Sequence, residues 1–366
     1  MKIPFLSFDY QNNTIAAEIK EAFQRVFDSK WYILGKELQE FEANYAKFNC
    51  VGHCVGVANG LDALQIALNT LGIGPGDEVI VPSNTYIATW LAISAVGATI
   101  IPVEPVSTTF NLDPQGIPGA ITSRTKLIMP VHLYGQPCQM EEIMTIAGAS
   151  GLLVVEDNAQ AQGATFNGRL AGSFGQINAT SFYPTKNLGA FGDAGALTTD
   201  DAGLAAKASV LRNYGSEKKY YNEMIGVNSR LDEMQAAFLS VKLKFLHTWN
   251  RQRKELAKKY DELLAGTGDL LLPAVAAGAG HVYHLYVIQT KQRDKLQEYL
   301  GRAGIETSVH YPVPPHLQKA YRHRFKPGAF PVAERLAATS LSLPLYPGMP
   351  EKDLYAVTES IKAFYG

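Results

Sequence analysis

Apolar positions along the first two thirds of the chain alternate between helical spacing and short strand-like runs. Residues 61–72 repeat leucine, isoleucine and alanine at helical spacing and end at a glycine, and residues 74–82 then form a short apolar run typical of a buried strand. The alternation continues through an expected helix, two strands, a helix and a third strand, at residues 88–97, 99–104, 126–135, 140–150 and 151–157. This rhythm predicts a doubly wound α/β fold with a mostly parallel sheet covered by helices.

A different pattern begins near residue 233. Apolar and charged residues alternate at helical spacing through residues 233–266, which predicts one extended or bent helix that bridges to a second domain. Beyond it the chain has one strand-like run and two helical runs, at residues 281–290, 291–304 and 351–366. We therefore expect a large α/β domain over residues 1–249 and a small α+β domain over residues 250–366, with the N-terminal segment free to pack on the small domain.

Composition narrows the classes of function. The chain has 366 residues, 46% of them hydrophobic, and 33 basic and 34 acidic residues leave a formal net charge of -1. This balance gives no electrostatic basis for binding nucleic acid or an anionic membrane, so small-molecule chemistry is expected. The sequence has no apolar run near the roughly 20 residues of a membrane span and no signal peptide, which indicates a cytoplasmic protein. The three cysteines, Cys50, Cys54 and Cys138, are too few for a disulfide framework or a closed zinc site.

The apolar run at residues 151–157 ends abruptly in two carboxylates, Glu156 and Asp157. Ligands of α/β sheets bind at the carboxyl ends of the strands, so this position is a candidate site. A carboxylate buried there needs a cationic or hydrogen-bonding partner, because an unpaired buried charge is strongly destabilising. Neighbouring strand residues face opposite ways, so one acid can serve a site while the other has a structural partner.

Lys186 is the single cation in "SFYPTKNLGAFGDAG", residues 181–195. A lone amine among aromatic, proline and glycine residues can be a plain surface residue, but Asp157 precedes it by 29 positions, and "ANGLDAL" opens a helix after a glycine. A lysine for a Schiff base, an acid for a ring nitrogen and helix N-terminal amides for a phosphate are what pyridoxal phosphate requires. The residues therefore indicate a site for that cofactor.

Several ordered motifs spread over nearly the whole chain carry a resemblance to a known family. They are "WYILGKELQEFE", "NGLDAL", "HLYGQP", "EDNAQAQGA", "SFYPTKNLGAFGDAGAL", "RNYGS", "VNSRLDEMQAAFL" and "VHYPVPPH". In these motifs the chain resembles the pyridoxal-phosphate sugar aminotransferases of the DegT/StrS type, within fold-type I. The resemblance implies a mostly parallel, seven-stranded sheet with flanking helices, a smaller C-terminal α+β domain, transaminase activity and a homodimer with shared active sites.

The resemblance also implies roles for residues in the matching motifs. Lys186 is similar to the lysine that carries the cofactor as a Schiff base and transfers protons, and Asp157 to the partner of the pyridine nitrogen. The other implied cofactor contacts are the ring-stacking Tyr86, Gln160 at the phenolic oxygen, the phosphate-binding Gly60, Leu61 and Ser181, and Asn228 from the second subunit. Two positions depart from the common pattern, since Gln162 replaces a histidine and Leu61 replaces a threonine or serine.

The wording of "NGLDAL" and "NSRLDE" resembles the branch that aminates C3 of nucleotide-linked 3-keto-6-deoxyhexoses. This implies a dTDP-linked keto sugar as substrate, glutamate as amino donor and pyridoxamine 5'-phosphate as the intermediate cofactor form. The product would be a 3-amino-3,6-dideoxyhexose for a surface glycan, such as an O-antigen or S-layer glycan, or for a natural product. A 4-keto-6-deoxyhexose aminotransferase and a non-catalytic regulatory protein are the alternatives, whereas related sugar dehydratases replace the lysine that Lys186 supplies.

Other conspicuous side chains have both a functional and a structural interpretation. The candidates for contacts with the sugar, the nucleotide or the donor carboxylate are Tyr183, His310, His316, Arg230, Lys218 and Lys219. His310 can also be a packing residue, Arg230 and Arg212 can form ion pairs, and the lysine pair can be a solvated charge run. His281 and His284 are expected to face opposite sides of a strand, which disfavours a joint metal site, and we expect no metal.

Overall fold

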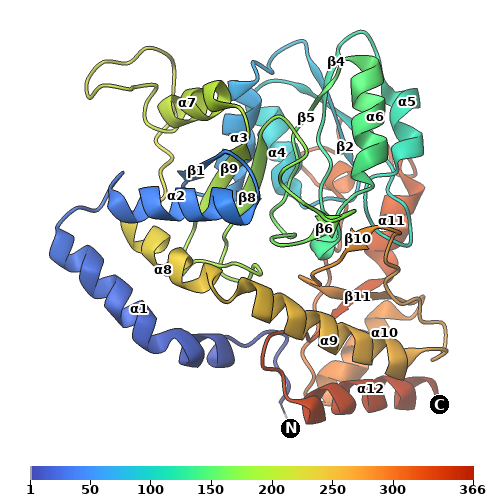
Figure 1. Ribbon diagram of the computed structural model, residues 1–366. Helices are drawn as coiled ribbons and strands as arrows, with labels where there is room; N and C mark the ends of the chain where they lie inside the picture. The colour runs from blue at the N-terminus through green and yellow to red at the C-terminus, as the bar shows by residue number, and fades with distance from the viewer. Residues whose placement is uncertain (1) are drawn as a thin grey trace.

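A central sheet of seven strands organises the upper body of the computed structural model, which describes residues 2–366 (Figure 1). The strands are β1 (His53–Val57), β2 (Glu78–Pro82), β3 (Thr99–Val103), β4 (Thr125–Ile128), β5 (Leu153–Val154), β8 (Asn178–Ser181) and β9 (Gly195–Thr199). Parallel bridges from Asp157 to Val131 and Ala179 join the groups β3-β2-β4-β5 and β8-β9-β1 into one sheet. Among these strands only β9 runs antiparallel to its neighbours, so the predicted mostly parallel sheet is confirmed.

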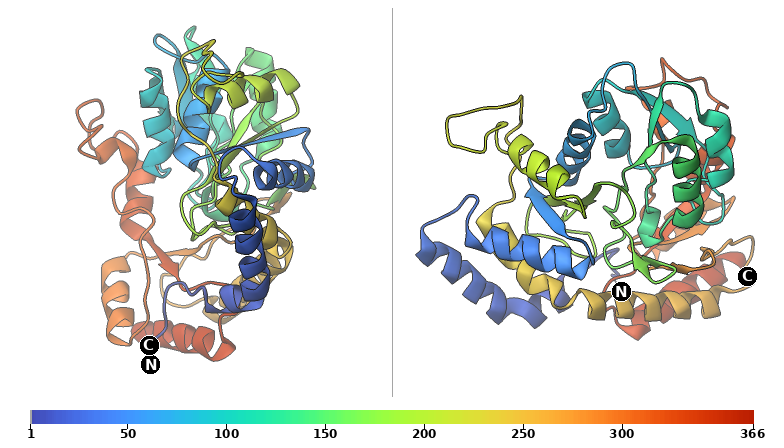
Figure 2. Two further views of the ribbon diagram at one scale, coloured as in Figure 1. Left: turned by 90° about the vertical axis from the view of Figure 1, so that its left-hand side faces the viewer. Right: turned by 45° about the horizontal axis from the view of Figure 1, so that its top comes forward.

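Helices pack around this sheet (Figure 2). They are α2 (Lys36–Phe48), α3 (Gly60–Thr70), α4 (Ile87–Ala95), α5 (Ile117–Ala120), α6 (Met140–Ser150) and α7 (Ala202–Leu211). The N-terminus of α3 is fixed by Asn59, whose side chain accepts a hydrogen bond of 2.8 Å from the backbone N–H of Asp62. Helix α3 therefore begins at Gly60, directly after Asn59 and three positions after the end of β1.

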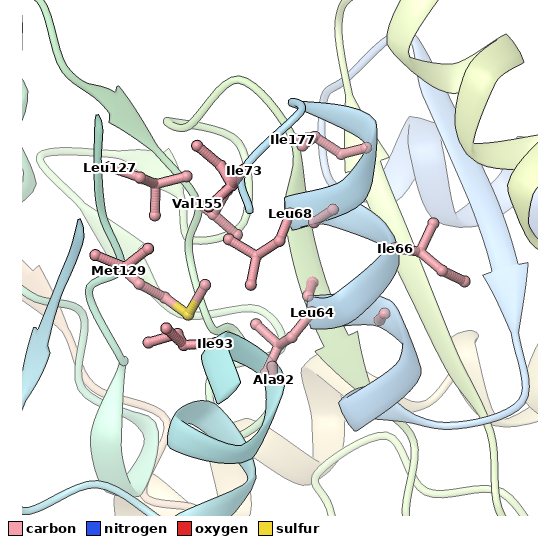
Figure 3. Packing of buried hydrophobic residues seen from close by; sticks show 14 of the residues in the cluster. Leu64, Ile66, Leu68, Ile73, Ala92, Ile93, Leu127, Met129, Val155 and Ile177 are labelled. Atoms are coloured by element: carbon pink, nitrogen blue, oxygen red, sulfur yellow. The ribbon is translucent and has the colours of Figure 1, made fainter. Parts of the chain in front are cut away.

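Helix α3 is buried on more than one side, which explains why its sequence is almost wholly apolar. Leu64 and Leu68 extend toward Met129 and Val155 of the sheet, while Ile66 extends from another side of the helix (Figure 3). Leu64, Ile66 and Leu68 are each at most 2% exposed. Full burial of such side chains contributes about 1.5–3 kcal/mol each, so the position of the N-terminus of α3 is strongly determined by packing.

The long helix predicted over residues 233–266 is present as two helices, α8 (Glu233–Leu243) and α9 (Leu246–Leu264), with a break at residues 244–245. Helix α1 (Asp9–Ser29), which the hydrophobic pattern did not single out, packs along α8 through Ile15, Ala22 and Val26. Its few apolar residues form a narrow stripe between many polar ones, so the pattern was too weak to detect. The predicted boundary at residues 249 and 250 lies inside α9 and stays a prediction.

The C-terminal part forms a smaller layer with α9 below the sheet (Figure 1). Its elements are β11 (Tyr286–Gln289), β12 (Ser340–Leu343), α10 (Arg293–Arg302), α11 (Pro331–Thr339) and α12 (Glu351–Tyr365). Strands β11 and β12 are antiparallel, and Ile3 forms a parallel bridge with Ile305 beside them. Ile3 also belongs to the hydrophobic cluster of this layer, so the N-terminal segment packs here.

The strand predicted over residues 126–135 is shorter than expected. The run at residues 126–135 is a strand only to Ile128, because Pro130 cannot donate a ladder hydrogen bond and Tyr134 has a left-handed backbone with φ of 59°. Residues beyond it form the short helix η2 (Leu133–Gly135). The remaining short elements are η1 (Pro114–Gly116), η3 (Pro315–Leu317), β6 (Thr165–Phe166), β7 (Arg169–Leu170) and β10 (Ala279–Gly280). Within residues 2–366, no helix is both long and apolar enough to cross a membrane.

Candidate active site

A cavity of about 550 Å³ lies beyond the carboxyl ends of the parallel strands. Its walls come from segments that directly follow β1, β2, β4, β5 and β8, which is where a doubly wound sheet binds ligands. Nine of the residues singled out in the sequence line it, namely Gly60, Leu61, Tyr86, Asp157, Gln160, Ser181, Tyr183, Lys186 and His310. The fold therefore brings together side chains that lie as much as 250 positions apart in the chain.

Asp157 is the buried acid of this cavity, with only 6% of its surface exposed. Its Oδ2 accepts a hydrogen bond of 2.8 Å from the hydroxyl of Thr89, and its Oδ1 accepts one of 3.1 Å from the backbone N–H of Ala159. Burial raises the pKa of Asp157 above its usual value, although these two hydrogen bonds and the nearby Lys186 oppose the shift. The carboxylate is held in one orientation but lacks the close cation that would fully stabilise its charge.

Glu156, the neighbouring acid, points away from the cavity into a structural network. Its carboxylate accepts hydrogen bonds from the backbone N–H groups of Gly172, Phe174 and Gly175 at 2.7, 2.5 and 3.0 Å. His132 donates a further one from Nε2 at 2.7 Å. The division predicted from strand alternation, with one acid for the site and one for the structure, is present.

Lys186 lies in the cavity wall on the turn after β8, where its backbone N–H donates to the carbonyl of Tyr183 at 2.8 Å. Part of its side chain still faces the open cavity. Desolvation by the surrounding protein lowers the pKa of Lys186 to about 8, and the negative charge of Asp157 opposes that shift. The amine is therefore closer to neutrality at physiological pH than an ordinary lysine, as a nucleophile or proton acceptor requires.

The N-terminus of α3 forms an anion-binding turn at one end of the cavity. The backbone amides of Gly60 and Leu61 are the first of the helix and have no intrahelical partner. Ser181 lies so close that a Cβ on Gly60 would be 2.5 Å from the Ser181 Cβ, and a Cβ on Gly195 would be 2.5 Å from the carbonyl oxygen of Asn59. Glycine is required at both positions because the backbones of α3, β8 and β9 approach each other there.

Aromatic side chains form the opposite wall. The ring of Tyr86 lies 5.1 Å from the ring of Tyr311, centroid to centroid. Gln160 donates from Nε2 to the hydroxyl of Tyr311 at 3.0 Å and accepts at Oε1 from the backbone N–H of Tyr134 at 2.6 Å. His310 is held by a hydrogen bond of 2.8 Å between its Nδ1 and the hydroxyl of Ser342. These contacts connect the large-domain strands to the C-terminal layer across the cavity.

Four candidates lie on the segment between α7 and α8, outside the cavity wall. Asn228 is exposed and forms an antiparallel bridge with Asn213. Arg230 donates to Oδ1 of Asn213 at 3.0 Å. Lys218 and Lys219 are exposed, and the Nζ atom of each lies over a tyrosine ring of the same segment, at 4.9 and 5.1 Å from the ring centroid. Within one chain these side chains do not reach the cavity.

Two further candidates have structural partners. His316 is fully buried away from the cavity, and its Nε2 lies 2.9 Å from Oε1 of Glu334. Arg212 is buried and donates from Nη1 to the carboxylate of Glu42 at 2.5 Å and to the carbonyl oxygen of Gly56 at 2.6 Å. The ion-pair alternative therefore holds for Arg212, and His316 is not brought to the cavity.

His281 and His284 precede β11, so the strand alternation expected for them does not apply. His284 lines the cavity, with Nδ1 3.3 Å from Oδ1 of Asn187. The ring of His281 instead stacks on Tyr283 at 3.8 Å. In the part of the chain that the structure describes, no group of three or more His, Cys, Asp or Glu side chains is placed to hold a metal ion.

The sequence analysis missed Tyr311, which lines the cavity, and Thr89, which donates to the carboxylate of Asp157. It named His284 but gave this residue no role in the site. Thr89 follows Tyr86 by three positions on one face of α4, so helical spacing gave a signal that was not used. Tyr311 directly follows His310 in "VHYPVPPH". His284 has no local signal, because only the path of the chain before β11 places it at the cavity.

The fold and the cavity define a class of protein: an α/β enzyme in which a lysine, a buried acid and a helix N-terminus meet at the carboxyl edge of a seven-stranded sheet. Comparison with known proteins identifies the family. The chain matches the DegT/DnrJ/EryC1/StrS aminotransferase family over residues 13–362, and it belongs to this family. The resemblance seen in the sequence motifs is confirmed.

Individual relatives are similar over almost their whole length. A dTDP-3-amino-3,6-dideoxy-alpha-D-galactopyranose transaminase of Aneurinibacillus thermoaerophilus is 50% identical over 362 residues, covering 99% of each chain. A dTDP-3-amino-3,4,6-trideoxy-alpha-D-glucose transaminase of Streptomyces venezuelae is 48% identical over 362 residues, covering 99% of this chain and 96% of that protein. The crystal structure of S. venezuelae DesV in complex with a ketimine intermediate has a TM-score of 0.98 at 48% identity, covering 100% of this chain and 98% of that one.

Proposed function

We propose that this protein transfers an amino group from glutamate to C3 of a dTDP-linked 3-keto-6-deoxyhexose. The protein is a pyridoxal-phosphate-dependent sugar aminotransferase by its family, and the choice of carbon and nucleotide is the proposal. The observation that carries it is the meeting of Lys186, Asp157 and the N-terminus of α3 in one cavity. Two relatives named as transaminases of dTDP-linked 3-amino sugars, at 50% and 48% identity, support the position of amination.

The cavity residues fit pyridoxal phosphate. Asp157 is a buried carboxylate that still needs a cation, which the protonated ring nitrogen of the cofactor provides. Gly60, Leu61 and Ser181 offer amides and a hydroxyl where the positive end of a helix dipole favours a phosphate. When bound, the cofactor supplies an electron sink for the negative charge left when a proton is removed from the amino donor. Tyr86 would cover the ring face, and Gln160 would contact the phenolic oxygen.

The transfer then needs one group that moves a proton and one that stabilises the charge of the cofactor ring. Lys186, whose pKa is lowered to about 8, would hold the cofactor and would accept a proton from the alpha carbon of the donor when its amine is free. Asp157 keeps its negative charge at the ring nitrogen, and Thr89 fixes the orientation of that carboxylate with its 2.8 Å hydrogen bond. The same lysine returns a proton when the amino group passes to the keto sugar.

The sugar would enter over the aromatic wall. Tyr183 and His310 line the cavity beside Lys186, and both offer groups that can hydrogen-bond to sugar hydroxyls. Burial lowers the pKa of His310 to about 4, with Lys186 acting in the same direction, so its imidazole is neutral at physiological pH. A neutral imidazole can donate one hydrogen bond and accept another, which suits a hydroxyl group.

We expect glutamate and dTDP-linked 3-keto-6-deoxyhexoses to give a product aminated at C3. The experiment is incubation of the holoenzyme with a panel of dTDP-linked 3-keto and 4-keto sugars, followed by mass spectrometry and NMR assignment of the aminated carbon. UDP-linked sugars in the same panel serve as a control for the nucleotide. Amination at C4 alone would replace the proposed substrate, and no amination of any sugar would favour the regulatory alternative.

A homodimer with shared active sites is the proposed assembly. Large apolar side chains are exposed on the C-terminal half of α1, just after that helix, and on the segment between α7 and α8. They are Phe23, Phe27, Trp31, Tyr32, Ile33, Tyr214, Tyr220, Tyr221, Ile225 and Val227. Both segments extend from the same side of the molecule (Figures 1 and 2). Exposed apolar surface of this extent is typical of an interface. Asn228, Lys218 and Lys219 lie on the same segment, where they would reach the cavity of the second copy.

We expect a mixture of two variants, one inactive and one impaired, to recover activity. Lys186→Ala removes the lysine of a chain's own site, and Asn228→Ala removes the phosphate contact that the chain gives to its partner. After equal mixing with subunit exchange, activity should reach about a quarter of the wild-type value, because half of the dimers hold one intact site. Activity assays on the separate and mixed variants measure this. No recovery after verified exchange would contradict the shared site.

The cytoplasm is the proposed location. Cys50, Cys54 and Cys138 are all free thiols, which suits a reducing compartment. A nucleotide-linked sugar and glutamate are both metabolites expected in that compartment.

A further inference from the structure

A second, smaller cavity of about 130 Å³ lies next to the candidate active site. Thr185, His284 and His310 line both cavities, so the smaller one is a side chamber on the lysine side of the site. Its remaining wall is largely apolar and includes Leu285 and Leu343. The chamber also holds one charged residue, Arg253, which the proposed reaction has not used.

Arg253 comes from α9 and is only 2% exposed. Its Nη1 donates to the backbone carbonyl oxygens of Leu345 at 3.0 Å, His284 at 3.3 Å and Tyr283 at 3.4 Å. Its Nε is buried and has no hydrogen-bond partner among residues 2–366. In the same residues Arg253 takes part in no ion pair.

A buried guanidinium without a carboxylate is an unusual arrangement, because such a charge is normally paired. Burial lowers the pKa of Arg253 to about 10, which still leaves the group protonated at physiological pH. Carbonyl oxygens compensate the charge only in part, and they contact one nitrogen of the three. Nε is itself buried without a partner, and Arg253 lines a chamber that a small anion can enter.

The two histidines that line the chamber do not supply positive charge for binding an anion. Burial lowers the pKa of both His284 and His310, so neither carries a charge at physiological pH. The positive charge on this side of the site therefore comes from Arg253 and Lys186. Thr185 directly precedes Lys186 in the chain and lines both cavities, so the chamber lies beside the turn that carries Lys186.

We propose that Arg253 binds a carboxylate of the amino donor in this side chamber. The planar guanidinium suits a carboxylate because it can present parallel N–H donors to both oxygens. The apolar wall formed by Leu285 and Leu343 suits the methylene groups of a dicarboxylate such as glutamate. This inference rests on the proposed function, since it names a contact for the donor in that reaction.

Arg253→Gln should weaken glutamate binding about 10- to 100-fold, the range expected for one charge-assisted hydrogen-bonded pair. The donor half-reaction can be followed from the absorbance of the bound cofactor during titration with glutamate. Calorimetric titration with 2-oxoglutarate provides a second readout that does not depend on turnover. Binding of dTDP should remain unchanged, because the nucleotide does not enter the chamber.

The matched control is Arg251→Gln on the same helix, because the Arg251 side chain is 70% exposed and pairs with Glu255. Arg253→Lys keeps a charge but lacks the planar fork, and it should bind glutamate with intermediate strength. If Arg253→Gln does not fold, the Arg253→Lys variant is used for the test in its place. Wild-type affinity for both glutamate and 2-oxoglutarate in a folded Arg253 variant would overturn the proposal. A wild-type enzyme that accepts no amino group from glutamate would instead refute the proposed function.

Discussion

Replacement of Lys186 by alanine abolishes transamination and the absorbance of cofactor attached to the protein. The loss of the general base alone lowers the rate by about 10²–10⁴-fold, and the loss of the covalent anchor adds to it. The variant should still fold, because the side chain lies in the cavity wall and its exposed part makes no essential core contact. Steady-state assays and an absorption spectrum after addition of the cofactor measure both effects.

The control for this variant is Lys258→Ala, because the Lys258 side chain is 79% exposed and pairs only with Glu262 on the same helix. It should retain wild-type activity. The lowered pKa of Lys186 also predicts a pH dependence in the wild-type protein. Attachment of added cofactor requires the neutral amine, so its rate rises about tenfold per pH unit below 8 and levels off above it. A fully active Lys186→Ala variant would refute the assignment of the lysine.

Asp157→Asn should weaken cofactor binding by about 3–5 kcal/mol, or roughly 10²–10⁴-fold, because the ring nitrogen loses its charged partner. The amide oxygen can accept the hydrogen bond from the backbone N–H of Ala159 while the amide nitrogen donates to the hydroxyl of Thr89, which can turn its own proton to Thr85, so the local geometry is kept. Fluorescence or absorbance titration of the cofactor-free variant gives the affinity. A variant that binds and uses the cofactor as well as wild type would remove Asp157 from the site.

The same substitution should leave the cofactor-free protein as stable as wild type or more so. The pKa of Asp157 is raised in the folded state, so the folded protein binds the proton more tightly than the unfolded chain does. Stability from this group is therefore present at low pH and decreases as the pH rises from the unfolded pKa through the folded one. At neutral pH the buried charge opposes folding until a cation arrives, and asparagine removes that charge.

Glu156→Gln is the contrasting variant, since it changes the neighbouring acid in the same way. The amide would place N–H donors against the backbone donors of Gly172, Phe174 or Gly175. It should therefore destabilise the cofactor-free protein by about 3–5 kcal/mol. In thermal unfolding of the cofactor-free proteins, the midpoint temperature of Glu156→Gln should thus lie below that of wild type, and the midpoint of Asp157→Asn should equal or exceed it.

The sequence predicted strands β2, β3, β4 and β5 and helices α3, α4 and α6, because these elements are apolar runs bounded by clear signals. Helix α3 was predicted from its apolar spacing and its terminal glycine. Strand β5 was predicted from the apolar run at residues 151–157, although it ends at Val154, before the two carboxylates. Strand β9 was not predicted, because its first residue, Gly195, belongs to a glycine-rich stretch without strand propensity. Only pairing with both β1 and β8 makes this stretch a strand.

The sequence predicted those site residues that stand in a conspicuous local motif. Lys186 and Asp157 stood out because each is a charged residue in an apolar context. Arg253 gave no such signal, since it lies in a run of exposed charges on α9, and only the structure shows that this one is buried. His316 shows the opposite case, because its place in a conspicuous motif does not bring it to the cavity. Local sequence does not encode which side of a helix or loop the rest of the chain covers.

The insertion of β9 between β1 and β8 determines when the phosphate turn can exist during synthesis. Val57 at the end of β1 pairs with Gly195, 138 positions later, and Gly195 is also the residue that lies against Asn59 and Gly60. At synthesis rates of about 5–20 residues per second, a nascent chain spends many seconds with β1 and α3 made but without that neighbour. The residues up to Gly195 must therefore all be synthesised before the cofactor has a complete phosphate-binding turn.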